Sequence, residues 1–219
     1  MGWHRNFSCK MIDIVITCKD RLQHLRKSHA TLLQAIGTRK DIKVYIVAYG
    51  DLLAYRWAKN NANGILVEAK GFNLSRARNI GAQKCTADWI MFADADTLFQ
   101  KDFFSNLDLQ AGYYYSGEPH CSGNCIVKRE DFIGYDENFI GYGGEDVDLY
   151  IGLTRKSLIK KQLNGISYIL HNDFERLRNY KGDKKWEQQK RNILYLMSKH
   201  PHEYIFPLYI PHEMKGILL

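Results

Sequence analysis

The first 96 residues alternate short apolar runs with longer amphipathic segments, and this alternation restricts the possible folds more than any other feature. The apolar runs have the length and composition of buried strands and occupy residues 12–17, 42–49, 65–68 and 88–93. The segments between them have helical periodicity and occupy residues 21–36, 51–61 and 74–84. Strands that alternate with helices predict an α/β fold with a mainly parallel central sheet flanked by helices, and place ligand-binding loops at the strand ends.

The rest of the chain predicts further elements of the same domain. It favours strands at 113–117, 124–128 and 166–170, and helices from Glu145 to about Leu163 and from Lys184 to Lys199. A chain of 219 residues, 45% of them hydrophobic, can bury a core, and no repeat or linker divides it. We therefore expect a single domain over residues 1–219.

Neither a membrane span nor a secretory signal is evident in the sequence. The longest apolar runs, such as Trp89–Ala93, are far shorter than the roughly 20 residues that a spanning helix needs. His4, Arg5 and Asn6 interrupt the apolar character of the N-terminal ten residues. We therefore expect a cytoplasmic protein, with peripheral association at a membrane as a further possibility that depends on its charge.

The cysteines favour reduced thiols over disulfides or a metal centre. The chain has five of them, an odd number, in a domain large enough to fold without cross-links. Cys121 and Cys125 lie beside His120, but no second cysteine pair at zinc-finger spacing accompanies them. Small buried side chains are the interpretation that we favour.

The net charge of +7 is confined to the C-terminal third of the chain. Residues 1–150 hold equal numbers of basic and acidic side chains, so the whole excess lies in residues 151–219. The expected helix 184–199 carries Trp186, Ile193 and Met197 along one stripe with four basic residues beside it. That pattern would suit an anionic membrane surface or DNA phosphates, but we favour a packed terminal helix with a solvated basic face.

Asp94-Ala95-Asp96 directly follows the most apolar predicted strand. Two carboxylates one residue apart at a strand end can face the same opening and hold a hard divalent cation against a diphosphate. A solvated acidic turn is the simpler interpretation of the motif alone. Its place at the ligand-binding edge of an α/β sheet favours a functional role.

A second group of polar residues follows glycines at positions 141, 143 and 144. Glu145, Asp146 and Asp148 fall on the first turn of a predicted helix, where the positive end of the helix dipole favours ionised carboxylates. Acidic capping alone would explain them, but Asp146 is also a candidate general base in a cleft wall. His171, after the last predicted strand, is a metal ligand only if other ligands lie near it.

Four segments in this order resemble the motifs of inverting glycosyltransferases with the GT-A (Rossmann-like) fold. They are Val15–Leu25, Phe72–Gly81, Asp94–Asp96 and Gly143–Asp146, within a resemblance that spans about residues 12–175. The similarity is greatest to the β-1,4-galactosyltransferase and chondroitin-polymerase type. It implies a nucleotide-sugar-binding half over about 1–100, an acceptor and catalytic half over about 101–175, and a basic helical extension over about 176–219.

The resemblance implies a set of residues that bind the nucleotide of a UDP-sugar donor. Thr17 and Arg21 match the first-strand loop that holds uridine, and Arg78 with Asn79 match a helix that flanks the nucleotide. Asp51 lies near the second strand, which binds nucleotide in the family, although the residues before it depart from the usual Asp-Gly-Ser pattern.

The resemblance also implies a Mn²⁺ or Mg²⁺ site. Asp94 matches the acid beside the ribose and phosphates and is a candidate metal ligand, Asp96 matches the acid that binds Mn²⁺, and His171 matches a later metal ligand. Tyr168 stands where galactosyltransferases have a methionine ligand, so the metal shell departs from the family pattern.

The resemblance assigns the reaction itself to the glycine-rich segment. Glu145 matches a contact to the transferred sugar and Asp146 the catalytic base, while Tyr142, Gly143 and Gly144 match the acceptor-binding loop. Related retaining enzymes have Asn after the Glu, and Asn cannot accept the proton, so Asp146 predicts inversion.

The function is left open between three hypotheses, two of which differ in the acceptor. The first is a saccharide or glycoconjugate, such as a lipid-linked precursor in polysaccharide biosynthesis. The second is a modified base of viral DNA, and the third is a catalytically inactive sugar-binding protein. Retention of both the candidate base and the candidate metal ligands favours an active enzyme.

Overall fold

The computed structural model describes residues 10–68, 71–118, 120–170 and 185–202, and every structural statement below refers to these residues. In chain order the elements are β1 (Ile12–Cys18), α1 (Leu22–Ile36), β2 (Ile42–Tyr49), α2 (Leu52–Asn61), β3 (Asn63–Val67), α3 (Leu74–Ala82), β4 (Trp89–Asp94), β5 (Thr97–Phe99), β6 (Tyr113–Tyr115), β7 (Cys125–Lys128), α4 (Glu145–Arg155), β8 (Lys160–Gln162), β9 (Ile166–Tyr168) and α6 (Lys185–Lys199).

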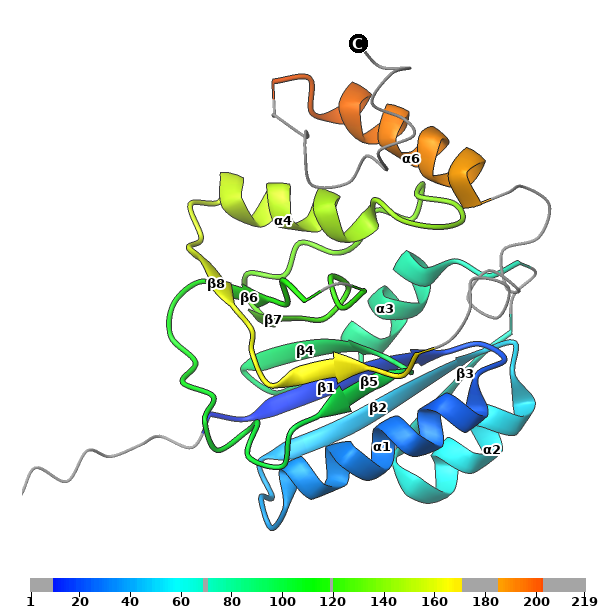
Figure 1. Cartoon of the computed structure of the whole chain (residues 1–219), viewed down its shortest axis with the longest axis vertical. Helices are drawn as coiled ribbons and strands as arrows, with labels where there is room; N and C mark the ends of the chain where they lie inside the picture. The colour runs from blue at the N-terminus through cyan, green and yellow to red at the C-terminus, as the bar shows by residue number, and fades with distance from the viewer. Residues whose placement is uncertain (1–9, 69–70, 119, 171–184, 203–219) are drawn as a thin grey trace, which may run out of the picture.

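The central sheet has seven strands in the order β3-β2-β1-β4-β7-β6-β8, and it is mainly parallel as predicted. The β7 strand runs antiparallel to both β4 and β6. In the parallel pairing of β1 with β4, Thr17 lies opposite Asp94, so the ends of both strands reach the same edge. Figure 1 shows α1 and α2 below the sheet and α3, α4 and α6 above it, with α6 stacked over α4.

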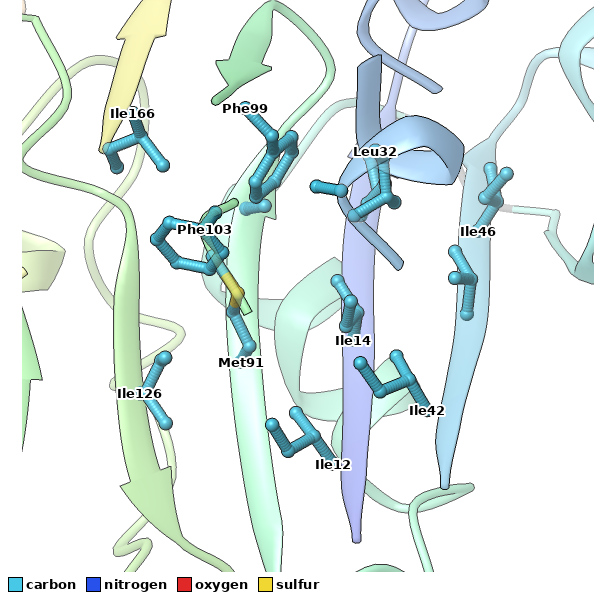
Figure 2. Packing of buried hydrophobic residues seen from close by; sticks show 14 of the residues in the cluster. Ile12, Ile14, Leu32, Ile42, Ile46, Met91, Phe99, Phe103, Ile126 and Ile166 are labelled. Atoms are coloured by element: carbon cyan, nitrogen blue, oxygen red, sulfur yellow. The ribbon is translucent and has the colours of Figure 1, made fainter. Parts of the chain in front are cut away.

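Alternating side chains of the strands build the core on both faces of the sheet. Ile12, Ile14 and Ile16 of β1 pack with Leu25 and Leu32 of α1, a packing that Figure 2 shows in part. The intervening residues of β1 face the opposite layer, which α3 and α4 cover. Both faces of a parallel sheet are thus buried, which explains why its strands are almost continuously apolar.

One predicted helix is wrong in its length. The helix expected from Glu145 to about Leu163 ends at Arg155, and Ser157 takes a backbone φ of +63° that breaks the helical path. Residues 160–162 form β8 instead, which pairs in parallel with β6. The open edge of β6 has backbone groups that need partners, and β8 supplies them.

The described cysteines are buried free thiols: Cys18, Cys85, Cys121 and Cys125. Burial raises the pKa of Cys18 and of Cys85 to about 12, so neither is a thiolate at neutral pH. Among the residues described, no helix is both long enough and apolar enough to cross a membrane.

Candidate active site

A cavity of about 660 Å³ opens at the ends of β1 and β4 and extends beneath α4. Its walls come from the ends of β1 and β4 and the loops that follow them, from α3, and from β6 and the loop after it. One face of α4 along its whole length, β8 and the first turns of α6 complete them. Residues that are far apart in sequence therefore meet in one space, at the edge where α/β sheets bind ligands.

Most of the predicted site residues line this cavity: Thr17, Arg21, Arg78, Asp94, Asp96, Tyr142, Gly143, Glu145 and Asp146. Three others, Asp51, Asn79 and Gly144, are not part of the lining. His171 lies outside the described residues, so its role as a metal ligand stays a prediction.

Arg78 of α3 joins the two acidic motifs at the centre of the site. Its Nη2 lies 3.1 Å from Oδ1 of Asp94, and its Nη1 lies 3.1 Å from Oε1 of Glu145. The guanidinium carbon lies 4.9 Å from the centre of the Tyr135 ring. Arg78 is only 1% exposed, which is rare for an arginine and is tolerated because two carboxylates and an aromatic face surround it.

Close packing around this ion pair requires a glycine at position 123. A Cβ atom there would lie 2.5 Å from Nη2 of Arg78 and 2.9 Å from Oδ2 of Asp94. Any side chain would displace one of these two groups, so the loop between β6 and β7 is fitted to the Arg78 network.

Burial and charge shift the pKa values of the two carboxyl groups that Arg78 contacts. Burial raises the pKa of Glu145 to about 7, with Asp146 raising it further and Arg78 opposing the rise. Burial also raises the pKa of Asp94, against the effect of Arg78 and with a contribution from the nearby negative charge of Asp96. The site therefore holds more negative charge than Arg78 alone compensates.

Asp96 faces the side of the cavity that β1 forms. Its Oδ2 lies 3.2 Å from Nη1 of Arg21 in the loop after β1, and the residue is 8% exposed. Asp94 and Asp96 are hard oxygen ligands of the kind that Mg²⁺ and Mn²⁺ prefer, and their mutual repulsion favours a cation between them. The carboxylates of Asp94 and Asp96 thus fit a cation. Within the described ranges no third metal-ligating side chain joins them, so a cation held there would need a further ligand.

Asp146 is the second residue of α4, two positions after Gly144. Gly144 has a φ of +102°, a left-handed conformation that favours glycine, and it caps the helix. Asp146 is 3% exposed, its Oδ1 accepts a hydrogen bond from the backbone N–H of Val147, and it lines the cavity. The turn thus holds a buried carboxylate one residue from Glu145.

Asn79 and Asp51 position loops and do not face the cavity. The amide of Asn79 donates to the backbone carbonyl of Tyr135 and accepts from the N–H of the same residue. Asp51 caps α2 by accepting from the N–H of Ala54, and it also accepts from the N–H of Asp20. Both therefore bind loop backbone, and their predicted contacts with the nucleotide stay predictions.

Two family models match the chain in succession. Residues 13–108 match "Glycosyl transferase family 2", and residues 104–179 match the model described as the N-terminal domain of galactosyltransferase. Together the matches include all of the candidate site residues. The chain is a glycosyltransferase. No curated protein matches it by sequence.

Solved structures with the GT-A fold resemble this glycosyltransferase. The Drosophila β1,4-galactosyltransferase 7 catalytic domain in complex with xylobiose has a TM-score of 0.63 and 17% identity, over 84% of this chain and 79% of that one. A Pyrobaculum calidifontis mannosyltransferase in complex with GDP-Man and Mn²⁺ has a TM-score of 0.66 and 13% identity, over 95% and 68% of the two chains. S. aureus TarS has a TM-score of 0.59 and 11% identity, over 93% and 46%. These similarities establish the fold.

The glycosyltransferase also uses residues that the sequence did not single out. Gln188 and Asn192 of α6 are 2% and 3% exposed. Oε1 of Gln188 accepts from the N–H of Tyr142, while Nδ2 of Asn192 donates to the carbonyls of Tyr142 and Gly143. The α6 helix thus holds the loop that is predicted to bind the acceptor. The sequence feature that could have indicated this role is the pair of polar residues one turn apart on the buried face of the helix.

The preferred interpretation of α6 as a packed helix is confirmed. Ile193 is 3% exposed and Leu196 packs with Phe139, whereas Trp186 is 47% exposed. The proposed stripe of Trp186, Ile193 and Met197 therefore does not form one solvent-facing surface.

We expect Asn192→Leu to destabilise the glycosyltransferase by about 1–3 kcal/mol, because two backbone carbonyls of the acceptor loop lose their donor. Urea unfolding measures the loss, and the exposed Leu194→Ala on the same helix is the control. Equal stability of both variants would show that Asn192 does not hold the loop.

Proposed function

We propose that this glycosyltransferase is metal-dependent and inverting, and that it moves a sugar from a UDP-sugar to a hydroxyl of a saccharide or glycoconjugate acceptor. The observation that carries the proposal is the buried Arg78, which joins Asp94 of the Asp-x-Asp motif to Glu145, next to Asp146, in one cavity. The wall formed by Thr17, Lys19 and Arg21 is the proposed nucleotide side.

In the proposed reaction Asp146 acts as the general base. Its carboxylate takes the proton of the acceptor hydroxyl while that oxygen attacks the anomeric carbon. The bond between the anomeric carbon and the diphosphate oxygen breaks, and UDP departs with the electron pair. A single displacement from the face opposite the leaving group inverts the anomeric configuration.

Glu145 and Arg78 have binding roles in this proposal. Glu145 accepts hydrogen bonds from hydroxyls of the transferred sugar, and Arg78 fixes the direction of its carboxylate. Tyr142 and Gly143 line the acceptor side of the cavity, where α6 holds their backbone.

The proposed cation is Mn²⁺ or Mg²⁺, held by Asp94, Asp96 and His171. Asp94 and Asp96 fit it through their oxygen ligands and their mutual repulsion. When bound, such a cation neutralises negative charge on the departing diphosphate. Among the similar structures, a Drosophila β1,4-galactosyltransferase 7 mutant is a complex with manganese, UDP-Gal and xylobiose.

We expect UDP to bind at least about tenfold more tightly in Mn²⁺ than in chelator, because the carboxylates meet the diphosphate through the cation. Calorimetry with UDP measures this difference. Asp96→Ala should abolish it, whereas the exposed Asp102→Ala should retain it. The metal assignment is wrong if the wild-type affinity is the same with and without Mn²⁺.

A further inference from the structure

The cavity continues past Asp146 along one face of α4. Asp146, Val147, Tyr150, Ile151 and Thr154 all line it, which is the spacing of residues on one side of a helix. From Asp146 to Thr154 the helix rises about 12 Å. That length exceeds one sugar ring, so the cavity has room for more of an acceptor than the unit whose hydroxyl reacts. We call the part lined by Tyr113, Tyr115, Tyr150, Thr154 and Lys160 the distal arm.

Tyrosines form the wall of the distal arm and are fixed in place. The rings of Tyr113 and Tyr150 stack at 5.6 Å, and the ring of Tyr115 lies 5.6 Å from that of Tyr150. The hydroxyl of Tyr113 lies 2.9 Å from Oγ1 of Thr154, and that of Tyr150 donates to the carbonyl of Ser122. Rigid rings with polar edges suit sugars, which present both C–H faces and hydroxyls.

Lys160 of β8 adds a cation to this wall. Its Nζ lies 3.9 Å from the centre of the Tyr115 ring, and the side chain lines the cavity. In the part of the chain that the structure describes, no carboxylate forms an ion pair with Lys160, although Glu118 in the loop after β6 also lines the cavity. The other acids that line the cavity are those of the candidate active site: Asp94, Asp96, Glu145 and Asp146.

The next residue of β8 provides an internal comparison. Nζ of Lys161 lies 5.5 Å from the ring of Tyr114, but Lys161 and Tyr114 are not part of the cavity lining. Successive residues of a strand face opposite sides, so only Lys160 is directed to the cavity.

We propose that Lys160 and Tyr115 form an acceptor subsite for an anionic group, a carboxylate or a phosphate, on a unit next to the one that receives the sugar. The inference rests on the proposed function for the direction of the acceptor. An ammonium held over an aromatic ring can pair with an anion while the ring contacts the sugar face.

NMR titration in the presence of UDP and Mn²⁺ tests the subsite with three matched probes: cellobiose, its uronate and its 6-phosphate. We expect the wild type to bind an anionic probe about tenfold more tightly than cellobiose. Lys160→Gln should remove this preference, and Lys161→Gln should keep it. A preference for the uronate or for the phosphate identifies the source of the anion.

Equal affinity for the three probes, absence of binding to all of them, or a preference that survives in Lys160→Gln would each overturn the subsite. Calorimetry of UDP alone separates this result from the proposed function. If UDP binds and the anionic preference is absent, only the subsite is wrong. If UDP does not bind, the donor assignment fails, and the probe titration without nucleotide decides the subsite.

Discussion

Asp146→Asn is expected to lower turnover by about a hundredfold or more while leaving UDP affinity nearly unchanged. Asparagine has nearly the shape of aspartate, so it can keep the helix start, but its amide cannot take a proton from the acceptor hydroxyl. Asp146 lines the cavity at 3% exposure, and Arg78 forms its ion pairs with Asp94 and Glu145, so we expect the donor contacts to remain.

Transfer from a UDP-sugar measured by mass spectrometry, together with UDP calorimetry, separates the two effects. Asp88→Asn, an exposed carboxylate on the same chain, is the control and should react like the wild type. Near-normal turnover of Asp146→Asn would remove Asp146 from the role of base. A wild-type product with retained anomeric configuration, determined by NMR, would have the same consequence.

Arg78→Met is expected to destabilise the fold by about 3–5 kcal/mol and to abolish transfer, because Asp94 and Glu145 lose the charge between them. Met fills much of the volume but leaves the carboxyl groups of Glu145, which is buried, and Asp94, which is half-buried, without a compensating charge. Arg78→Lys should recover part of the stability and little activity, because an ammonium cannot span both carboxylates as the two guanidinium nitrogens do.

The stability loss of Arg78→Met should depend on pH. Without Arg78 the pKa values of Asp94 and Glu145 rise further, so the folded variant binds more protons than the folded wild type. Its stability relative to the wild type therefore falls as pH rises, and the deficit should be larger near about pH 8 than near about pH 5.

Urea unfolding at both pH values tests this expectation. The exposed Arg76→Met, on the same helix, is the matched control and should change stability little at either pH. A deficit that is small, or that grows as pH falls, would contradict the view that Arg78 compensates buried negative charge.

The order of the elements and the edge of the sheet that carries the candidate site were predictable because both depend on local patterns. The apolar runs of β1, β2 and β4 are buried almost throughout, so burial is visible in the sequence itself. Asp94 is the last residue of β4 and Asp96 lies two positions further on, so the end of that strand determines where they lie. Asn73 caps α3 as its residue type suggests, by accepting from the N–H of Arg76.

The boundary of α4 could not be predicted in the same way. Residues after Arg155 continue a plausible helical pattern, but β6 presents an open edge that pairs with residues 160–162. Pairing with a distant strand outweighs a weak local preference.

By itself the sequence determined the α/β architecture and drew attention to Asp94, Asp96 and Asp146, since periodicity, strand ends and glycines act over a few neighbouring positions. The resemblance to a glycosyltransferase family implied the other candidate residues of the site. Only the tertiary structure decided how these residues meet. Arg78 and Glu145 are 67 positions apart, and a helical arginine is normally solvated, so nothing local indicates that it is buried between two carboxylates. The contacts of Asn192 with the acceptor loop and of Lys160 with Tyr115 likewise join distant segments. Such contacts stabilise the protein only after folding has brought those segments together.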